Sequence, residues 1–276
     1  SLVLGGIGGV GVIAACLAPP LIATDVLTRM FPFARGLYED KVANVWCAIS
    51  IAVKMHRVVP DREMLVRLCG ACTVGAALPA MVAYVFRRPA LLLRRPSKPH
   101  GSAPLDAAIR FGLALTASSL AFFLFAFQVH EKGIMMPCCG LTLAAAIAVL
   151  RGPDAASVYG NGAGLLHLAV HLHTAALFSM APLAVKDAHM PIPFLPVFGL
   201  LSCWSLGLAR RVGVTRVRIT RYSLAAMWAV LAIHAVYVPP AQFPDIVSLL
   251  YAMVGCAHFV GVFARGLYEH LDGGDI

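Results

Sequence analysis

Long apolar runs of membrane-spanning length constrain this chain more than any other feature of its sequence. A helix rises 1.5 Å per residue, so about 20 apolar residues cross roughly 30 Å of hydrocarbon. Charged residues make up only 13% of the chain, about half the usual share of a soluble domain. We therefore predict an all-α polytopic membrane protein with about eight transmembrane helices. The eight predicted spans are Leu2–Ile22, Met64–Phe86, Leu105–Phe127, Ile134–Leu150, Ala163–Val185, Ile192–Ala209, Tyr222–Val238 and Pro244–Ala264.

A ninth run, Val42–Val59, is ambiguous because it contains Lys54, His56 and Arg57. A charge at mid-bilayer costs a few kcal/mol, and an amphipathic helix lying at the interface avoids that cost. We expect an interfacial helix here, and a membrane crossing is the alternative. The predicted organisation is a span over residues 1–22, a non-cytosolic loop over 23–63 and a seven-span bundle over 64–276.

The distribution of basic residues predicts the orientation in the membrane. With Val42–Val59 left out of the bilayer, the arginine-rich loops all fall on one side, which the positive-inside rule makes cytosolic, together with the C-terminus. The formal net charge of +9 then faces anionic lipid headgroups, and no nucleic-acid partner is expected. The loop over residues 23–63 mixes acidic with basic residues. Any chemistry is therefore expected on the non-cytosolic face.

Three patterns resemble known sites but are better explained by membrane packing. The glycines of Gly5–Gly11 lie in a membrane-length run, where small residues let helices approach closely. The pair Cys69-x-x-Cys72 also lies in a span and lacks a second pair. His167, His171 and His173 have zinc-like spacing without a nearby acid, so we interpret them as polar residues facing the bundle or the headgroups. No metal site is expected.

Two polar segments are stronger candidates for a functional site. The first, Arg29–Cys47, packs both signs of charge among aromatic residues, and either a headgroup belt or a surface site for a polar ligand would explain it. The second is His130-Glu131-Lys132, placed between two apolar spans. Lys132 and a protonated His130 could hold a phosphate that Glu131 helps to orient. The simpler alternative for the second segment is snorkelling at a helix end.

These two segments also carry a family resemblance. Phe31–Cys47 and Phe123–Lys132 resemble two signatures of the endoplasmic-reticulum glucosyltransferases that use dolichyl-phosphate glucose, and Pro182–Asp187 and Pro239–Asp245 are weaker echoes in the family's order. The stretch Leu37–Asn44 resembles the first-glucose member more than the second-glucose member.

The resemblance implies a fold, a reaction and a location. The fold would be that of the C-type glycosyltransferases, here in part. The reaction would be α-1,3-glucosyl transfer from dolichyl-phosphate glucose onto a mannose-rich, dolichyl-diphosphate-linked oligosaccharide, at a lumenal site of a multi-pass protein in the endoplasmic-reticulum membrane. No cofactor is implied. The absence of an Asp-x-Asp pair fits an inverting, metal-independent enzyme.

The resemblance also implies which residues bind the substrates. His130, Lys132 and Arg35 are expected to stabilise the departing lipid phosphate. The expected substrate-binding set is completed by Glu131, Glu39, Asp40, Lys41 and Asn44. Of these, Glu39, Asp40 and Asn44 could either shape the sugar site or hold the lumenal helix in place. The family's general base lies in an N-terminal half that this sequence does not contain, so we expect the chain to be a C-terminal portion and leave its catalytic residue unknown.

Two other classes of function remain open from the sequence. A transporter or channel would use His130-Glu131-Lys132 as an ion or proton relay, although no internal repeat is apparent. A non-catalytic membrane subunit would need no polar motif of this length.

Overall fold

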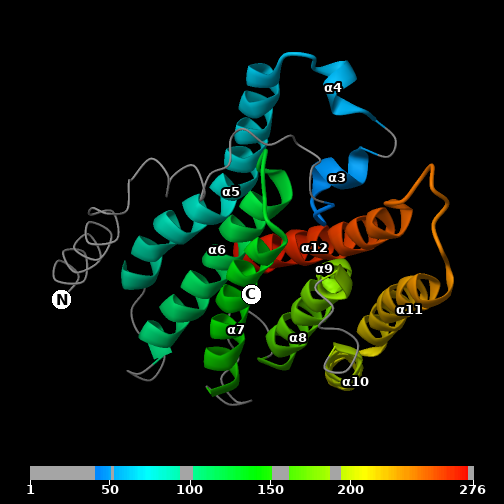
Figure 1. Ribbon diagram of the computed structural model, residues 1–276. Coiled ribbons are helices and arrows are strands. Elements are labelled where there is room, and N and C mark those ends of the chain that lie inside the picture. The colour runs from blue at the N-terminus through cyan, green and yellow to red at the C-terminus, as the bar shows by residue number, and fades with distance from the viewer. Residues whose placement is uncertain (1–40, 51–52, 94–101, 151–161, 187–193, 273–276) are drawn as a thin grey trace, which may run out of the picture. The chain divides into compact units, whose positions relative to one another are not determined.

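The computed structural model describes residues 41–50, 53–93, 102–150, 162–186 and 194–272. The chain divides after Glu39 into two units, and all described residues belong to the second, Asp40–Ile276. They form helices without a strand (Figure 1). The helices are α3 (Val45–Ile49), α4 (Met55–Val58), α5 (Arg62–Leu93), α6 (Ser102–Phe125), η1 (Glu131–Ile134), α7 (Met135–Leu150), α8 (Gly162–Ser179), α9 (Ala181–Lys186), α10 (Phe194–Val212), α11 (Val214–Val236) and α12 (Ile246–Asp272).

Five described segments are long and apolar enough to cross a membrane, which confirms the all-α polytopic prediction. They are Arg62–Val85, Leu105–Phe125, Glu131–Leu150, Val214–Val236 and Ile246–Arg265. The predicted span Leu2–Ile22 lies outside the described residues. Helices α8 and α10 form where spans were predicted but are not among the five. The three histidines of α8 lower its hydropathy.

Two predicted spans have different helix boundaries in the structure. Ala163–Val185 is not one helix, because α8 ends at Ser179 and α9 begins at Ala181. Pro182 follows immediately, and proline fits the first turn of a helix but not its interior. The span predicted to start at Tyr222 begins eight residues earlier, at Val214, because arginine is a good helix former and continues the helix beyond the apolar run.

The segment Val42–Val59 also differs from the single interfacial helix that we expected. It contains two short helices, α3 and α4, with Ser50 as the C-cap of the first and Lys54 as the N-cap of the second. Trp46 and Cys47 are buried, and α3 packs against α12 and α6. Helix α3 therefore buries part of its surface against the bundle, a contact that a hydropathy pattern does not reveal.

Helix α12 is the central packing element, in contact with α3, α5, α6, α8, α9 and α11 (Figure 1). Helices α6 and α7 approach each other closely at Gly112 and Gly140. A Cβ atom added to Gly112 would lie 2.8 Å from the carbonyl oxygen of Gly140, and one added to Gly140 would lie 2.8 Å from Oγ1 of Thr116. Small residues at this crossing let the two backbones touch.

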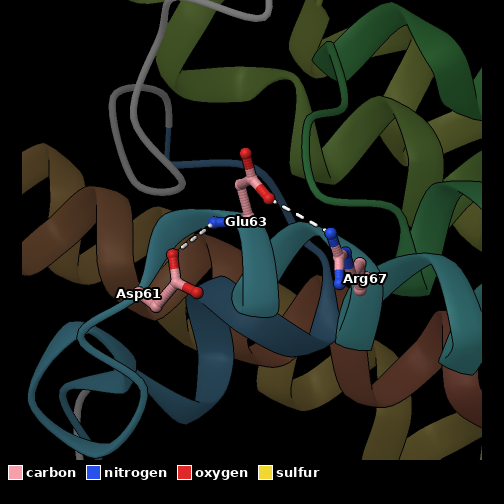
Figure 2. Close-up of polar contacts among 3 residues, drawn as sticks. All are labelled: Asp61, Glu63 and Arg67. Carbon is pink, nitrogen blue, oxygen red and sulfur yellow. Dashed lines mark hydrogen bonds and ion pairs between the residues drawn. The ribbon is translucent and has the colours of Figure 1, made fainter.

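The start of α5 has its own set of polar contacts (Figure 2). The Asp61 carboxylate accepts a hydrogen bond from the backbone N–H of Glu63 at 3.0 Å. Glu63 in turn pairs with Arg67 across one helical turn at 3.1 Å. Carboxylates at a helix N-terminus satisfy free N–H groups and oppose the positive end of the helix dipole. The chain thus balances this helix end with its own residues.

Candidate functional site

A hydrogen bond joins the two signature-like segments. The indole Nε1–H of Trp46, in α3, donates to the carbonyl oxygen of Phe125, the last residue of α6, at 2.7 Å. The two residues are 79 positions apart, and Trp46 is only 6% exposed. The bond fixes the start of the second segment against the end of the first. Arg35, Glu39 and Asp40 lie outside the described residues.

An ion pair brings a third segment to the same region. Nζ of Lys41 lies 3.3 Å from Oδ2 of Asp245, which directly precedes α12. Asp245 ends the weaker echo Pro239–Asp245, so three of the four family-like segments meet in the tertiary structure. The Asp245 side chain is 58% exposed, and such an exposed pair contributes at most about 1 kcal/mol. The ion pair therefore shows that Pro239–Asp245 lies beside Lys41, but it contributes little to the stability of the fold.

The tripeptide His130-Glu131-Lys132 forms the connection between α6 and α7. His130 is the N-cap residue of η1, and its carbonyl accepts a hydrogen bond from the N–H of Gly133 at 2.8 Å. Ile134 is fully buried and anchors the turn. His130 and Lys132 are exposed, and Glu131 is half-buried. In the described part of the chain, no hydrogen bond or ion pair engages these three side chains, so they are available to a ligand.

Asn44 has a local role at the start of α3. Its side chain caps α3 by accepting a hydrogen bond from the backbone N–H of Cys47 at 2.8 Å, and it is only 4% exposed. A buried cap of this kind positions the helix that carries Trp46. From the sequence, Asn44 could either shape the sugar site or hold this helix in place, and no separate role was expected of Trp46 or Asp245. The only sequence feature that pointed to Trp46 and Asp245 was that each lies in a segment resembling the family.

A cavity of about 470 Å³ lies beside the tripeptide. Its lining residues come from α5, α6, the α6–α7 connection and α7, namely Met81, Ser118, Ser119, Phe122, Phe123, Ala126, Gln128, Val129, Gly133 and Met136. The hydroxyls of Ser118 and Ser119 donate to backbone carbonyls of their own helix. The wall is therefore mostly apolar, which suits an apolar ligand.

The histidines of α8 belong to a separate network inside the bundle. Nδ1 of His171 lies 3.1 Å from Oγ of Ser205 in α10, and its Nε2 lies 3.0 Å from Oγ of Ser223 in α11. Ser223 also contacts His258 in α12, and His167 bonds Thr220 at 3.0 Å. Such hydrogen bonds between helices hold membrane bundles together.

Within the described residues, no group of three or more potential ligands could hold an ion. The thiols of Cys69 and Cys72 are free.

The sequence of this chain matches a known family over nearly its full length. The family is described as the ALG6, ALG8 glycosyltransferase family, and the match covers residues 2–265. This chain belongs to that family. Its membership agrees with the family resemblance of the two polar segments.

The chain spans less than half the length of the curated relatives that it matches, although each alignment covers most of the chain. A probable dolichyl pyrophosphate Man9GlcNAc2 alpha-1,3-glucosyltransferase of Drosophila melanogaster is 33% identical over 88% of the chain and 44% of the relative. The Saccharomyces cerevisiae protein described as dolichyl pyrophosphate Man9GlcNAc2 alpha-1,3-glucosyltransferase is 30% identical over 88% of the chain and 37% of the relative. The Gallus gallus protein of the same description is 26% identical over 86% and 45%.

Proposed function

We propose that this chain contributes the donor-phosphate site of a glucosyltransferase. The enzyme would transfer glucose from dolichyl-phosphate glucose to a Man9GlcNAc2 oligosaccharide on dolichyl diphosphate, through an α-1,3 linkage. The acceptor follows from the names of the relatives. The observation that carries the proposal is the 2.7 Å bond between Trp46 and Phe125, because it links the two segments that resemble the family's signatures.

The proposed reaction is a displacement at the anomeric carbon with inversion. A hydroxyl oxygen of the acceptor sugar attacks C1 of glucose, the bond from C1 to the phosphate oxygen breaks, and dolichyl phosphate departs with the electron pair. A carboxylate base takes the proton of the hydroxyl; we assign no base among the described residues. The departing phosphate is stabilised by positive charge.

His130 and Lys132 supply that positive charge in the proposal, joined by Arg35. Both described side chains are exposed and have no partner within the described residues. An imidazolium N–H and an ammonium group each form charge-assisted hydrogen bonds with phosphate oxygens. Glu131, half-buried between them, orients one or the other. Lys41, Glu39 and Asp40 belong to the sugar side of the site, where Asp245 holds Lys41 in place.

The cavity beside the tripeptide receives the first isoprene units of the dolichyl chain. Its lining is mostly apolar, and Gly133 and Val129 lie within a few residues of His130. An apolar chain entering there leaves its phosphate at the tripeptide. We further propose that the protein resides in the endoplasmic-reticulum membrane with this site on the lumenal face.

The ion-relay alternative receives less support from the geometry. A relay requires its ionisable groups near the middle of the membrane. His130 lies in the connection between α6 and α7, and Glu131 begins the candidate span Glu131–Leu150. The tripeptide is therefore at a helix end, where a substrate headgroup would lie.

The variant His130→Ala, made in the protein expressed from its complete gene, tests the proposal. Glucosyl transfer from radiolabelled dolichyl-phosphate glucose in membranes should fall about 100-fold or more, the usual cost of removing one group that stabilises developing negative charge. His173→Ala is the matched control, because Nδ1 of His173 bonds only its own helix, at the carbonyl of Ala169. Wild-type turnover of His130→Ala would remove His130 from the mechanism.

A further inference from the structure

The connection between α10 and α11 is a corner one residue long. Helix α10 ends at Val212 and α11 begins at Val214. Gly213 between them has φ of 148°, in the region that side-chain-bearing residues rarely adopt. The chain therefore turns sharply here, and the last turn of α10 lies next to the first turns of α11. We call Arg210–Tyr222 the arginine corner.

Among the residues that the structure describes, the arginine corner carries positive charge that no carboxylate balances. Arg210, Arg211, Arg218 and Arg221 are all exposed. No aspartate or glutamate occurs between residues 194 and 244. Within the described part of the chain, no ion pair engages these four guanidinium groups. Arg216, in the first turn of α11, is half-buried, and the four exposed guanidinium groups can each form paired hydrogen bonds with phosphate oxygens.

The start of α11 adds the positive end of a helix dipole to the charge of the arginines. The N-terminus of a helix is its positive end, and acidic residues normally lie in its first turn. The first turn of α11 has none, and Arg218 and Arg221 follow within its first two to three turns. At the start of α5, by contrast, Asp61 and Glu63 supply the negative charge (Figure 2).

Large apolar side chains are exposed among the arginines. Val214 is 73% exposed, Ile219 58% and Tyr222 77%. Along its length, α11 buries only a narrow stripe, formed by Thr220, Leu224, Met227 and Val230. Arginine mixed with exposed aliphatic and aromatic residues is typical of a surface that meets the headgroup region of a bilayer.

We propose that the arginine corner binds the headgroup of an anionic phospholipid of the surrounding bilayer. The phosphate oxygens lie among the guanidinium groups of Arg211, Arg218 and Arg221, and the acyl chains run along the exposed face of α11 from Ile219 and Tyr222. Charge complementarity selects a lipid of net negative charge over phosphatidylcholine.

This lipid site is separate from the proposed donor site. Helix α11 has 23 residues, so at 1.5 Å per residue it places the corner about 35 Å from its other end. The Tyr237–Asp245 stretch leads from that other end to the ion pair of Asp245 with Lys41. If α11 crosses the membrane, the two sites face opposite leaflets.

Short-chain lipid titration of the purified protein in neutral detergent tests the proposal. Dioctanoyl phosphatidylinositol should raise the melting temperature and bind saturably, whereas dioctanoyl phosphatidylcholine should do neither. The triple variant R211Q/R218Q/R221Q should bind phosphatidylinositol about 100-fold more weakly, since one basic residue near an anionic surface contributes about fivefold. Binding by wild-type protein should also weaken as salt concentration rises.

Matched variants keep the test decisive. R57Q/R67Q also removes exposed arginines, one of which is already paired with Glu63, and should bind like wild type. R211K/R218K/R221K preserves charge and should retain most of the affinity, which separates lost charge from misfolding. Equal binding by the triple Gln variant and wild type would overturn the proposal. So would full competition by inorganic phosphate at the same concentration, because the site would then recognise a soluble anion.

Discussion

Two polar regions, one toward each end of α11, differ in whether their polar groups have partners within the described chain. Where α3 meets the start of α12, Lys41 has a carboxylate partner and the indole of Trp46 has a carbonyl partner. At the arginine corner, four exposed guanidinium groups have no carboxylate partner within the described residues. The first region uses contacts within the chain to position a site. The second leaves its charge available to something outside the chain.

The start of α5 shows that this protein can balance a helix end internally. Asp61 and Glu63 oppose the helix dipole there, and Glu63 also pairs with Arg67. The lack of such residues at the start of α11 is therefore a property of that region and not of the whole chain. Three variants test the difference between regions whose charges are paired within the chain and the arginine corner, in order of decreasing effect on stability.

Trp46→Phe should have the largest effect of the three. It keeps an aromatic ring but removes the Nε1–H that bonds Phe125, leaving that carbonyl without its partner at a cost of about 1–2 kcal/mol. We expect a lower melting temperature and a higher KM for dolichyl-phosphate glucose, with kcat affected less. Trp204→Phe is the control, since Trp204 is 57% exposed. Identical kinetics of the two variants would show that the bond does not position the site.

Asp245→Asn should have a smaller effect, because the ion pair with Lys41 is partly exposed. The expected loss is about 0.5 kcal/mol in the free energy of unfolding. The difference from wild type should shrink at high salt, which screens exposed pairs. Denaturation measured at low and high salt concentration checks this. A difference that persists unchanged in 1 M salt would mean that the contact is not mainly ionic.

Thr215→Asp should have the smallest effect on stability, and in the opposite direction. Thr215 is exposed in the first turn of α11, so a carboxylate there would oppose the helix dipole and stabilise the protein by about 0.3 kcal/mol. The same charge should weaken binding of phosphatidylinositol severalfold, making α11 resemble α5. Thr215→Asn, which is polar but uncharged, is the comparison. Stronger lipid binding by the aspartate variant would contradict the difference drawn between the two regions.

The sequence alone determined the class of this protein and much of its helical framework. Run length and hydropathy are local properties, so α5, α6, α7, α11 and α12 could be placed from them with errors mainly at the ends. The two polar segments could also be recognised locally, because each signature is continuous in the chain.

Only the tertiary structure decided how the segments meet. The bond from Trp46 to Phe125 and the pair of Lys41 with Asp245 join residues far apart in sequence, and no periodicity encodes such pairings. The contacts of α3 with α12 and α6 likewise depend on burial between segments far apart in sequence. Local free energies select helices, whereas the packing of side chains between helices selects which of them share a site.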